Sequence, residues 1–306
     1  MSFRGNSLAC KKENQEKIMT PFADSMFNEI TRCPWCNSES REDWGEPQDG
    51  IQAVECSKCG LIYMGKMLNA EGLAKFYSDH LSQVHLADEN KRQQRELMYQ
   101  LEFKYIHGFT GPCSVLDVGC SGGYFLDVFK EQGYETLGVE IGTEGAAECG
   151  KKHSVYQGDF AFMDFDRKFD LIVFRGVIEH IPLPKTYLEK ALSLLNDGGY
   201  IYITSTPNAQ SVPCRVFKDK WRLHNPLPHL MHFSVRHFDE YFASHGFCKR
   251  GEHFLYEETP YANIEEDILL VAKAIEAVRE GKKIDFASPP FYGVMMSVVY
   301  QKEGEQ

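Results

Sequence analysis

The sequence contains no long apolar run and no excess of positive charge. No apolar run approaches the roughly 20 residues that cross a membrane, and the N-terminal residues lack the apolar centre of a secretory signal. Asp and Glu outnumber Lys and Arg by 44 to 33, which gives a net charge of −11. Such a charge disfavours nucleic acid as a partner, because nucleic-acid affinity depends on neutralising phosphates. We therefore expect a cytoplasmic protein without a membrane span.

Ten cysteines are present, but their arrangement does not indicate a disulfide framework. Four of them form two C-x-x-C pairs, C-P-W-C and C-S-K-C, separated by 19 residues. This spacing is typical of a four-thiolate zinc site, because each short pair can place two sulfurs on one tetrahedral ion. Structural disulfides would need a secreted chain. A redox C-x-x-C pair would need a thioredoxin-like βαβ context, which this sequence lacks. We expect structural zinc, with the ligands Cys33, Cys36, Cys56 and Cys59.

A strand that runs directly into a glycine-rich turn lies near the middle of the chain. Apolar residues surround Asp117 in V-L-D-V-G-C-S-G-G-Y, which spans 115–124, and a helix is expected from residue 125. Strand, turn and helix in this order present backbone N–H groups to a nucleotide-like ligand. The dinucleotide motif G-x-G-x-x-G fits poorly, because serine and tyrosine occupy its second and third glycine positions.

The string G-C-S-G-G in this turn also fits the nucleophile elbow of a hydrolase. An elbow follows several earlier strands, whereas the pattern of residues 65–112 indicates helix. Asp117 has no role in an elbow. The hydrolase interpretation is therefore disfavoured, and it becomes the alternative if no nucleoside-like ligand binds.

Two acidic residues follow at the ends of the next predicted strands. Glu140 ends T-L-G-V-E, 21 residues after Gly119, and Asp159 lies in Y-Q-G-D-F. A carboxylate at the tip of the second strand can accept both ribose hydroxyls of a bound nucleoside. Apolar strands continue to alternate with helical stretches, so the sequence predicts an α/β fold with a doubly wound parallel sheet.

In this order and spacing, the segments from about 113 to 255 resemble a class I S-adenosylmethionine (SAM) methyltransferase. The resemblance implies a Rossmann-like, doubly wound, seven-stranded sheet that binds SAM at the glycine turn. Many small-molecule methyltransferases of this class also carry an N-terminal four-cysteine zinc ribbon, and they act on sugars, surface glycans and secondary metabolites. The cofactor-binding residues that the resemblance implies are Asp117, Gly119, Cys120, Ser121, Gly123, Tyr124, Glu140, Ile141, Asp159, Phe160 and Arg175.

The segment 207–234 is rich in histidine and proline and resembles the substrate loop of the same enzymes, with the pattern W…P-x-H-L…F-S. Methyl transfer to a hydroxyl needs a base, and histidine titrates near neutral pH. We expect His180 to be this base, because it follows the fourth predicted strand. Arg175 at the same strand tip is expected to bind an anionic substrate group or to pair with Glu179. The catalytic candidates are His180, His229, His232 and Arg175.

The length accommodates one full α/β domain and a small accessory module. The predicted divisions are a polar, loosely ordered tail at 1–30, a zinc ribbon at 31–64, a helical linker at 65–112 and a SAM methyltransferase domain at 113–306, which includes the substrate loop 207–234 and a helical insertion at 256–290. The ribbon is acidic, so we expect it to pack beside the substrate entrance.

These features predict transfer of a methyl group from SAM to a small molecule, with a hydroxyl of a sugar or glycan precursor, alone or nucleotide-linked, as the expected acceptor. An RNA methyltransferase that holds RNA with the ribbon and a non-catalytic SAM-binding protein remain alternatives. Related carbon methyltransferases have a further C-terminal domain, and this chain ends at 306, so carbon methylation is disfavoured. Gly176 replaces the first glutamate of the Glu-x-x-Glu-His metal motif of quinone O-methyltransferases, so a catalytic metal is not expected.

Overall fold

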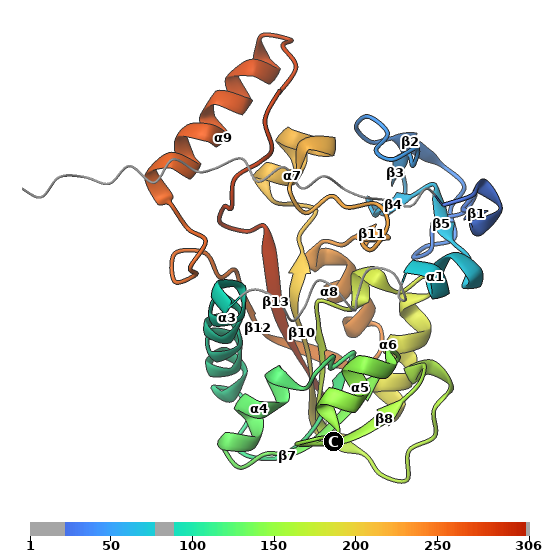
Figure 1. Ribbon diagram of the computed structural model, residues 1–306, viewed down its shortest axis with the longest axis vertical. Helices are drawn as coiled ribbons and strands as arrows, with labels where there is room; N and C mark the ends of the chain where they lie inside the picture. The colour runs from blue at the N-terminus through green and yellow to red at the C-terminus, as the bar shows by residue number, and fades with distance from the viewer. Residues whose placement is uncertain (1–21, 77–88, 304–306) are drawn as a thin grey trace, which may run out of the picture.

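The computed structural model describes residues 22–76 and 89–303 of the chain. Its centre is a seven-stranded sheet with the strand order β12-β13-β10-β9-β6-β7-β8 (Figure 1). The strands are β6 (Ser114–Val118), β7 (Glu135–Glu140), β8 (Ser154–Gln157), β9 (Phe169–Arg175), β10 (Leu195–Pro207), β12 (Phe247–His253) and β13 (Met295–Lys302). The expected seven-stranded, Rossmann-like α/β sheet is confirmed.

Six of these strands share one direction, and β13 runs antiparallel to both of its neighbours. The prediction of a wholly parallel sheet is therefore wrong for this strand. After β12 the chain passes through α9 (Ile264–Arg279) beyond the carboxyl edge of the sheet and enters β13 from that edge. A parallel β13 would need a crossover back to the opposite edge.

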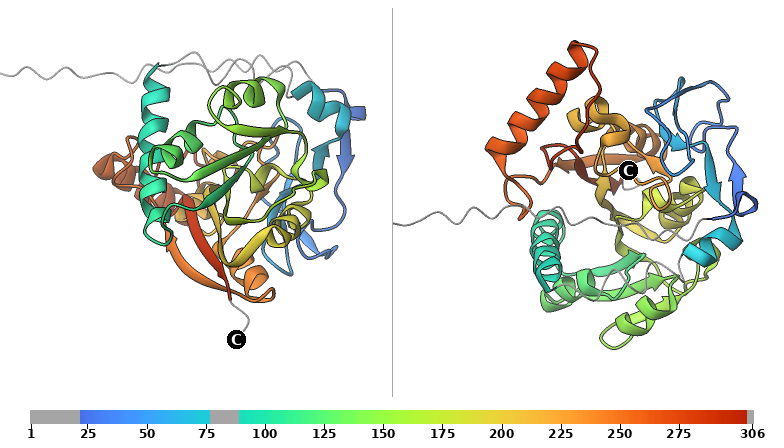
Figure 2. Two further views of the ribbon diagram at one scale, coloured as in Figure 1. Left: turned by 90° about the horizontal axis from the view of Figure 1, so that it is seen from below. Right: turned by 45° about the horizontal axis from the view of Figure 1, so that its top comes forward.

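Alternate residues of the central strands face two separate hydrophobic cores. The helices around the sheet are α3 (Glu89–His107), α4 (Tyr124–Glu131), α5 (Thr143–Cys149), α6 (Pro184–Ser193) and α8 (Val235–Ala243). Leu171 and Val173 of β9 pack with α3 and α4, whereas Ile172 and Phe174 pack with α6 and α8. Figure 2 shows these helices around the sheet from two directions. Because neighbouring strand residues point to opposite faces, each helix layer buries one face of the sheet.

The four-cysteine segment belongs to a second, four-stranded sheet with the order β11-β4-β3-β2. Three of its strands lie within the predicted ribbon: β2 (Arg41–Asp43), β3 (Ala53–Cys56) and β4 (Ile62–Met64). The fourth, β11 (Met231–His232), comes from the predicted substrate loop. Met231 pairs with Tyr63 and His232 with Ile62. The ribbon and the large domain therefore share one sheet.

Two predicted boundaries near the N-terminus differ from the structure. The elements found there are η1 (Asp24–Met26), β1 (Phe27–Glu29), β5 (Lys66–Leu68) and α1 (Ala70–Phe76). The tail prediction is wrong for β1, which pairs antiparallel with β5, and the helical linker begins with that strand. This pairing joins segments that lie far apart in the sequence, so local polarity did not reveal it. Residues 1–21 of the tail and 77–88 of the linker lie outside the described residues.

The predicted substrate loop contains regular structure. Besides β11 it holds α7 (Val212–Phe217) and η5 (Lys218–Lys220), so the loop prediction is wrong for these residues. Ser211 caps α7 by accepting a hydrogen bond from the N–H of Cys214 at 3.3 Å, and Pro213 lies in the first helical turn. Proline is tolerated in a first turn, where its missing N–H has no helical partner. In the described part of the chain, no helix combines the length and apolar character needed to cross a membrane.

Candidate functional site

The glycine-rich turn lies between β6 and α4, at the carboxyl end of the central strands. Gly119 and Gly123 have φ angles of 76° and 79°, in the left-handed region that favours glycine. A Cβ at Gly119 would lie 2.6 Å from a methyl carbon of Val177, and one at Gly123 would lie 2.8 Å from the Cys149 sulfur. Both the backbone angles and the close neighbours therefore require glycine at these positions.

The side chains of the turn have different surroundings. Ser121 is exposed, and the half-buried Tyr124 ring covers Gly122, where an added Cβ would lie 2.7 Å from the ring. Cys120 is buried, with its sulfur 3.7 Å from that of Cys149. The contact with Cys149 and burial both raise the pKa of the Cys120 thiol. This thiol stays protonated, so it is unsuited to act as a nucleophile.

Glu140, at the end of β7, is hydrogen-bonded to the glycine turn. Its carboxylate accepts hydrogen bonds from the backbone N–H of Ser121 at 2.8 Å and of Gly142 at 2.7 Å. The next side chain, Ile141, is half exposed. The structure therefore brings the predicted ribose-binding carboxylate to the glycine turn, where the second parallel strand ends.

Asp117 lies on β6 beneath the turn and is 2% exposed. Burial raises the pKa of its carboxyl to about 7, although Arg175 acts in the opposite direction. Among the residues that the structure describes, none forms a hydrogen bond with its Oδ1 atom. A buried polar atom without a partner costs about 1–3 kcal/mol. This oxygen is therefore available to a donor group of a bound ligand.

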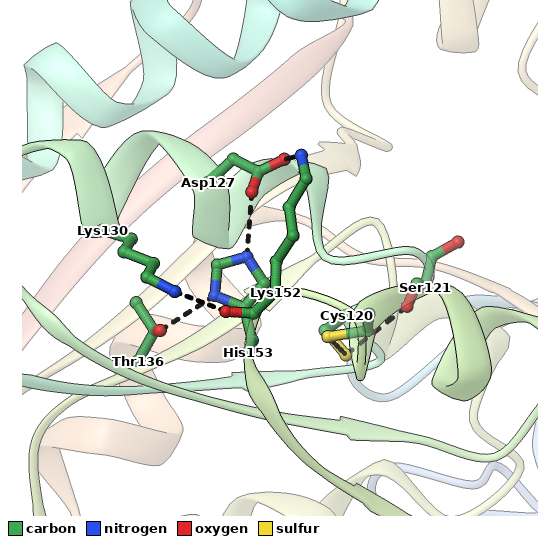
Figure 3. A network of polar contacts seen from close by, with 8 residues as sticks. Cys120, Ser121, Asp127, Lys130, Thr136, Lys152 and His153 are labelled. Carbon is green, nitrogen blue, oxygen red and sulfur yellow. Dashed lines mark hydrogen bonds and ion pairs between the residues drawn. The ribbon is translucent and has the colours of Figure 1, made fainter.

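A polar network lies beside the turn (Figure 3). Asp127 of α4 accepts hydrogen bonds from Lys152 at 2.7 Å and from Nε2 of His153 at 3.0 Å. The other ring nitrogen of His153 lies 2.9 Å from the hydroxyl of Thr136 on β7. The network holds α4, β7 and the segment after α5 together next to the glycine turn.

Asp159 follows β8 and caps the short helix η3 (Phe160–Phe162). Its Oδ1 accepts hydrogen bonds from the N–H of Ala161 at 3.0 Å and from the hydroxyl of Tyr187 at 2.5 Å. The ring of Phe160 is buried against Phe174 and Tyr187. The Phe160 side chain is part of the core, and its role as a cofactor contact stays a prediction. The apolar pattern of β8 could not show that the ring of Phe160, in the turn after this strand, packs into the core.

Arg175 ends β9 and pairs with Glu102 of α3, so the expected pairing with Glu179 is wrong. Its Nε lies 2.5 Å from a Glu102 carboxylate oxygen, and its guanidinium lies 4.4 Å from the centre of the Tyr99 ring. Glu102 is 1% exposed, so the ion pair is shielded from water. Sequence reasoning missed Glu102 and Tyr99, because only the docking of α3 brings them to Arg175 and no local pattern marks them.

The rings of His180 and His229 lie side by side, with ring centres 4.9 Å apart and planes tilted by 59°. Nδ1 of His180 donates to the carbonyl of Pro228 at 2.5 Å, and Nδ1 of His229 donates to the carbonyl of Leu223 at 2.6 Å. A carbonyl can only accept, so each Nδ1 carries the proton and each Nε2 keeps a lone pair. Burial lowers the pKa of both rings, that of His180 to about 3. Both histidines are therefore neutral acceptors at physiological pH.

Glu179 adjoins this histidine pair. One carboxyl oxygen lies 3.9 Å from Nε2 of His180, and burial raises the pKa of Glu179 to about 8. The possible ligand atoms of Glu179, His180 and His229 all lie within 4.8 Å of one another. Two neutral imidazoles and a carboxyl group are donors that suit a divalent transition metal. This cluster can therefore accept a proton or a metal ion.

His232, the third histidine predicted to be catalytic, lies deeper in the protein than the other two. It is 0% exposed, with Nε2 2.9 Å from Nδ1 of His224 and its ring 5.1 Å from that of Trp221. Its ring therefore belongs to the core between the ribbon and the large domain. The sequence could not separate His232 from His229, because the pairing of β11 with β4 decides which ring is covered.

The thiols that the spacing singled out come together in the structure: Cys33, Cys36, Cys56 and Cys59. Their sulfurs all lie within 4.8 Å of one another, with 3.6 Å between Cys33 and Cys59 and 3.5 Å between Cys36 and Cys56. Sulfurs bound about 2.3 Å from a tetrahedral zinc ion lie about 3.8 Å apart, so the group fits zinc. Asn37 and Gly60 follow the two pairs with φ angles of 60° and 77°. Both are left-handed, as tight knuckles around a metal require.

A family whose model is described as a methyltransferase domain matches residues 71–250. The match covers more than half of the chain. Together with the sheet order and the glycine turn, it establishes the class: the chain belongs to this methyltransferase-domain family.

Two curated relatives share part of this sequence. A ubiquinone biosynthesis O-methyltransferase of Coxiella burnetii (strain Dugway 5J108-111) is 28% identical over 150 residues, which are 45% of this chain and 62% of that protein. A protein of the same name from Proteus mirabilis (strain HI4320) is 25% identical over 101 residues, which are 30% of this chain and 41% of that protein. The chain thus spans less than two thirds of the length of these relatives.

A solved structure of similar fold is the 1,6-didemethyltoxoflavin-N1-methyltransferase of Burkholderia thailandensis, with 1,6-didemethyltoxoflavin and S-adenosylhomocysteine bound. The TM-score is 0.50 at 14% identity, and the match covers 86% of this chain and 100% of that chain. At this identity the likeness shows a shared fold.

Proposed function

We propose that the protein is a SAM-dependent methyltransferase that acts on a hydroxyl group of a small molecule. The observation that carries the proposal is the contact between Glu140 and the glycine turn. It places a carboxylate, exposed backbone and a helix N-terminus at the carboxyl edge of the parallel strands, which is where nucleoside ligands bind in such sheets. Membership of the methyltransferase-domain family supports the same function.

The proposed SAM site extends along this edge of the sheet. Glu140 is positioned to accept the ribose hydroxyls, and Asp159 to accept the adenine amino group. Asp117 offers its unpartnered oxygen beneath the turn, while Tyr124 covers the methionine end. When bound, SAM supplies an electrophilic methyl group on a positively charged sulfur. The three carboxylates suit a cationic methyl donor, because opposite charges attract.

The histidine pair supplies a proton acceptor beside the fourth strand. Nε2 of His180 takes the hydroxyl proton while the acceptor oxygen bonds to the methyl carbon, and the electrons of the broken carbon–sulfur bond stay on sulfur. Because burial lowers the pKa of His180 to about 3, the ring is a weak base, and the proton leaves only as the forming carbon–oxygen bond makes the hydroxyl acidic. The hydrogen bond to Pro228 fixes the tautomer that leaves Nε2 open. His229 has the same tautomer and can orient the hydroxyl. Alignment and exclusion of water account for the rest of the rate enhancement.

For the acceptor, we propose a hydroxyl of a sugar or glycan precursor. The support is the similarity of the 207–234 segment to small-molecule methyltransferases that act on sugars, together with the histidine pair that this segment completes. The name of the curated relatives suggests a different acceptor, a precursor in ubiquinone biosynthesis. Both acceptors present a hydroxyl, so the same base serves either one.

For the ribbon, we propose one structural zinc ion held by Cys33, Cys36, Cys56 and Cys59. Four thiolates complete a tetrahedral site and leave no open position for an acceptor. The metal would therefore stabilise the fold of the small ribbon without taking part in methyl transfer.

The test is a calorimetric titration of the purified full chain with SAM, followed by an assay of S-adenosylhomocysteine release. The acceptor panel contains nucleotide sugars, free sugars, phenols and total RNA. We expect SAM to bind and a hydroxyl compound to stimulate release. Failure to bind SAM would contradict the function, and stimulation by RNA alone would favour the RNA methyltransferase alternative.

A further inference from the structure

Two consecutive backbone hydrogen bonds connect the ribbon to the neighbours of the proposed catalytic histidines. The N–H of Met64, at the end of β4, donates to the carbonyl of Leu230 at 3.0 Å. The N–H of Leu230 donates in turn to the carbonyl of Glu179 at 2.9 Å. Leu230 therefore lies between a ribbon strand and the turn η4 (Ile178–His180), with both of its backbone groups bonded.

The two histidines flank these hydrogen bonds. His229 directly precedes Leu230, and His180 directly follows Glu179. The backbone hydrogen bond between Leu230 and Glu179 thus joins the neighbours of the two rings, whose centres lie 4.9 Å apart. Together with the hydrogen bond from Nδ1 of His180 to the carbonyl of Pro228, this backbone bond fixes the separation of His229 from His180.

Two tryptophans of the ribbon pack against residues that precede and follow His229 in the chain. Trp44 is 2% exposed and packs against His224 and His232, with ring centres 5.1 and 5.9 Å apart. Trp35, which lies between two of the zinc-ligand cysteines, packs against Phe233 at 5.4 Å. Buried aromatic contacts of this kind contribute more than their apolar area alone. The ribbon core therefore covers the chain before and after His229.

We propose that the four-cysteine ribbon is a positioning element of the catalytic site, which holds His229 against His180 through Leu230 and Trp44. This inference rests on the proposed function. Trp44 and Leu230 are positioning residues, because they act through the histidines. The proposed SAM residues lie on β6, β7, the first residue of α4 and the segment after β8, which belong to the large sheet and its helices. Loss of the ribbon fold should therefore stop methyl transfer and leave SAM binding intact.

The first experiment compares hydrogen exchange in the zinc-loaded full chain before and after metal removal by a chelator. Metal content is measured by plasma mass spectrometry, and binding of S-adenosylhomocysteine is measured by calorimetry. We expect the amides of residues 229–233 to exchange about tenfold faster or more after metal removal, because local opening controls their protection. Peptides from β6 and β7 should keep their exchange rates, and ligand affinity should stay within about twofold.

The second experiment uses variants that keep the metal ligands. Trp44→Ala removes the ring from His224 and His232, and we expect kcat to fall by about tenfold or more with KM for SAM unchanged. Trp44→Phe retains an aromatic contact and should keep most of kcat, which is the rescue expected of a positioning role. Glu39→Ala is the control, since it removes the exposed ion pair with Arg32 within the ribbon without touching β11. This control should keep the wild-type kcat.

Unchanged exchange at 229–233 after complete metal removal would overturn the positioning role. A wild-type kcat in zinc-loaded Trp44→Ala would overturn it as well. If the zinc-loaded wild type does not bind SAM, the proposed function fails instead, and the exchange rates still decide whether the ribbon holds His229. The two proposals therefore fail in distinguishable ways.

Discussion

The carboxylate of Glu140 accepts a hydrogen bond from the backbone N–H of Ser121 at 2.8 Å, which ties the tip of β7 to the glycine turn. Each carboxylate oxygen accepts one backbone bond, and a carboxylate has about four lone-pair positions. Glu140 can therefore hold the turn in place and still accept hydroxyl groups from a ligand.

Replacing Glu140 by alanine should weaken SAM binding by about tenfold or more, which corresponds to about 1.4 kcal/mol. The substitution removes the ribose acceptor and the tie to Ser121 together. Calorimetric titration with SAM measures the effect. Glu131→Ala, which removes an exposed carboxylate at the far end of α4, serves as the control and should bind normally. An unchanged affinity in the Glu140 variant would contradict the site assignment.

SAM binding should also depend on Asp117 and on pH. Asp117→Ala should lower the affinity by about tenfold or more, as for Glu140. Since burial raises the pKa of Asp117 to about 7, the carboxyl ionises as the pH rises through that value. The ionised form attracts a cationic donor, so wild-type affinity should increase across this range, while Asp117→Asn should show a flat profile. Titrations at several pH values measure this, and parallel profiles for the two proteins would exclude the role of Asp117.

His180→Ala should reduce the methyl-transfer rate by about 10²–10⁴-fold, the range that general-base catalysis contributes. SAM affinity should stay unchanged, because the ring lies outside the proposed SAM site. The assay is S-adenosylhomocysteine release with the best acceptor from the panel. His245→Ala removes an exposed ring at the end of α8 and should remain active. Full activity of the His180 variant would eliminate this histidine as the base.

Glu179→Gln should change how stability depends on pH. The pKa of Glu179 is raised from 4.5 to about 8 in the folded protein. The stability that comes from keeping this group protonated is fully present below the unfolded pKa and is lost as the pH rises through the folded pKa. Glutamine cannot ionise, so the variant should melt about 2–4 °C or more above the wild type at high pH, with little difference at low pH. Melting curves across this range test the sign, and a difference that shrinks as the pH rises would contradict it.

Metal analysis of the purified protein should find one zinc ion per chain. Cys36→Ser should lose the metal, and the ribbon should melt at a lower temperature, because zinc binding supplies folding free energy to such small modules. Cys248→Ser, which changes a cysteine outside the cluster, should keep zinc and stability. A second bound metal that His229→Ala removes would place an ion at Glu179, His180 and His229.

Local signals in the sequence predicted several elements of the large sheet. The apolar run of β6 and the turn at Gly119 and Gly123 could be recognised, because burial on both faces and positive φ angles restrict the residue types. The direction of β13 could not be recognised. It depends on which edge of the sheet the chain occupies after β12, and apolar periodicity carries no information about that.

The same distinction applies to the site. The sequence by itself determined the glycine turn, the acidic strand end at Glu140 and the four-cysteine spacing, because each is a short-range pattern with a direct physical cause. Only the tertiary structure decided that Arg175 pairs with Glu102, that His232 is buried while His229 lies beside His180, and that β11 pairs with the ribbon strand β4. These outcomes arise from contacts between segments far apart in the chain. Such contacts depend on how the two sheets pack, which no local pattern encodes.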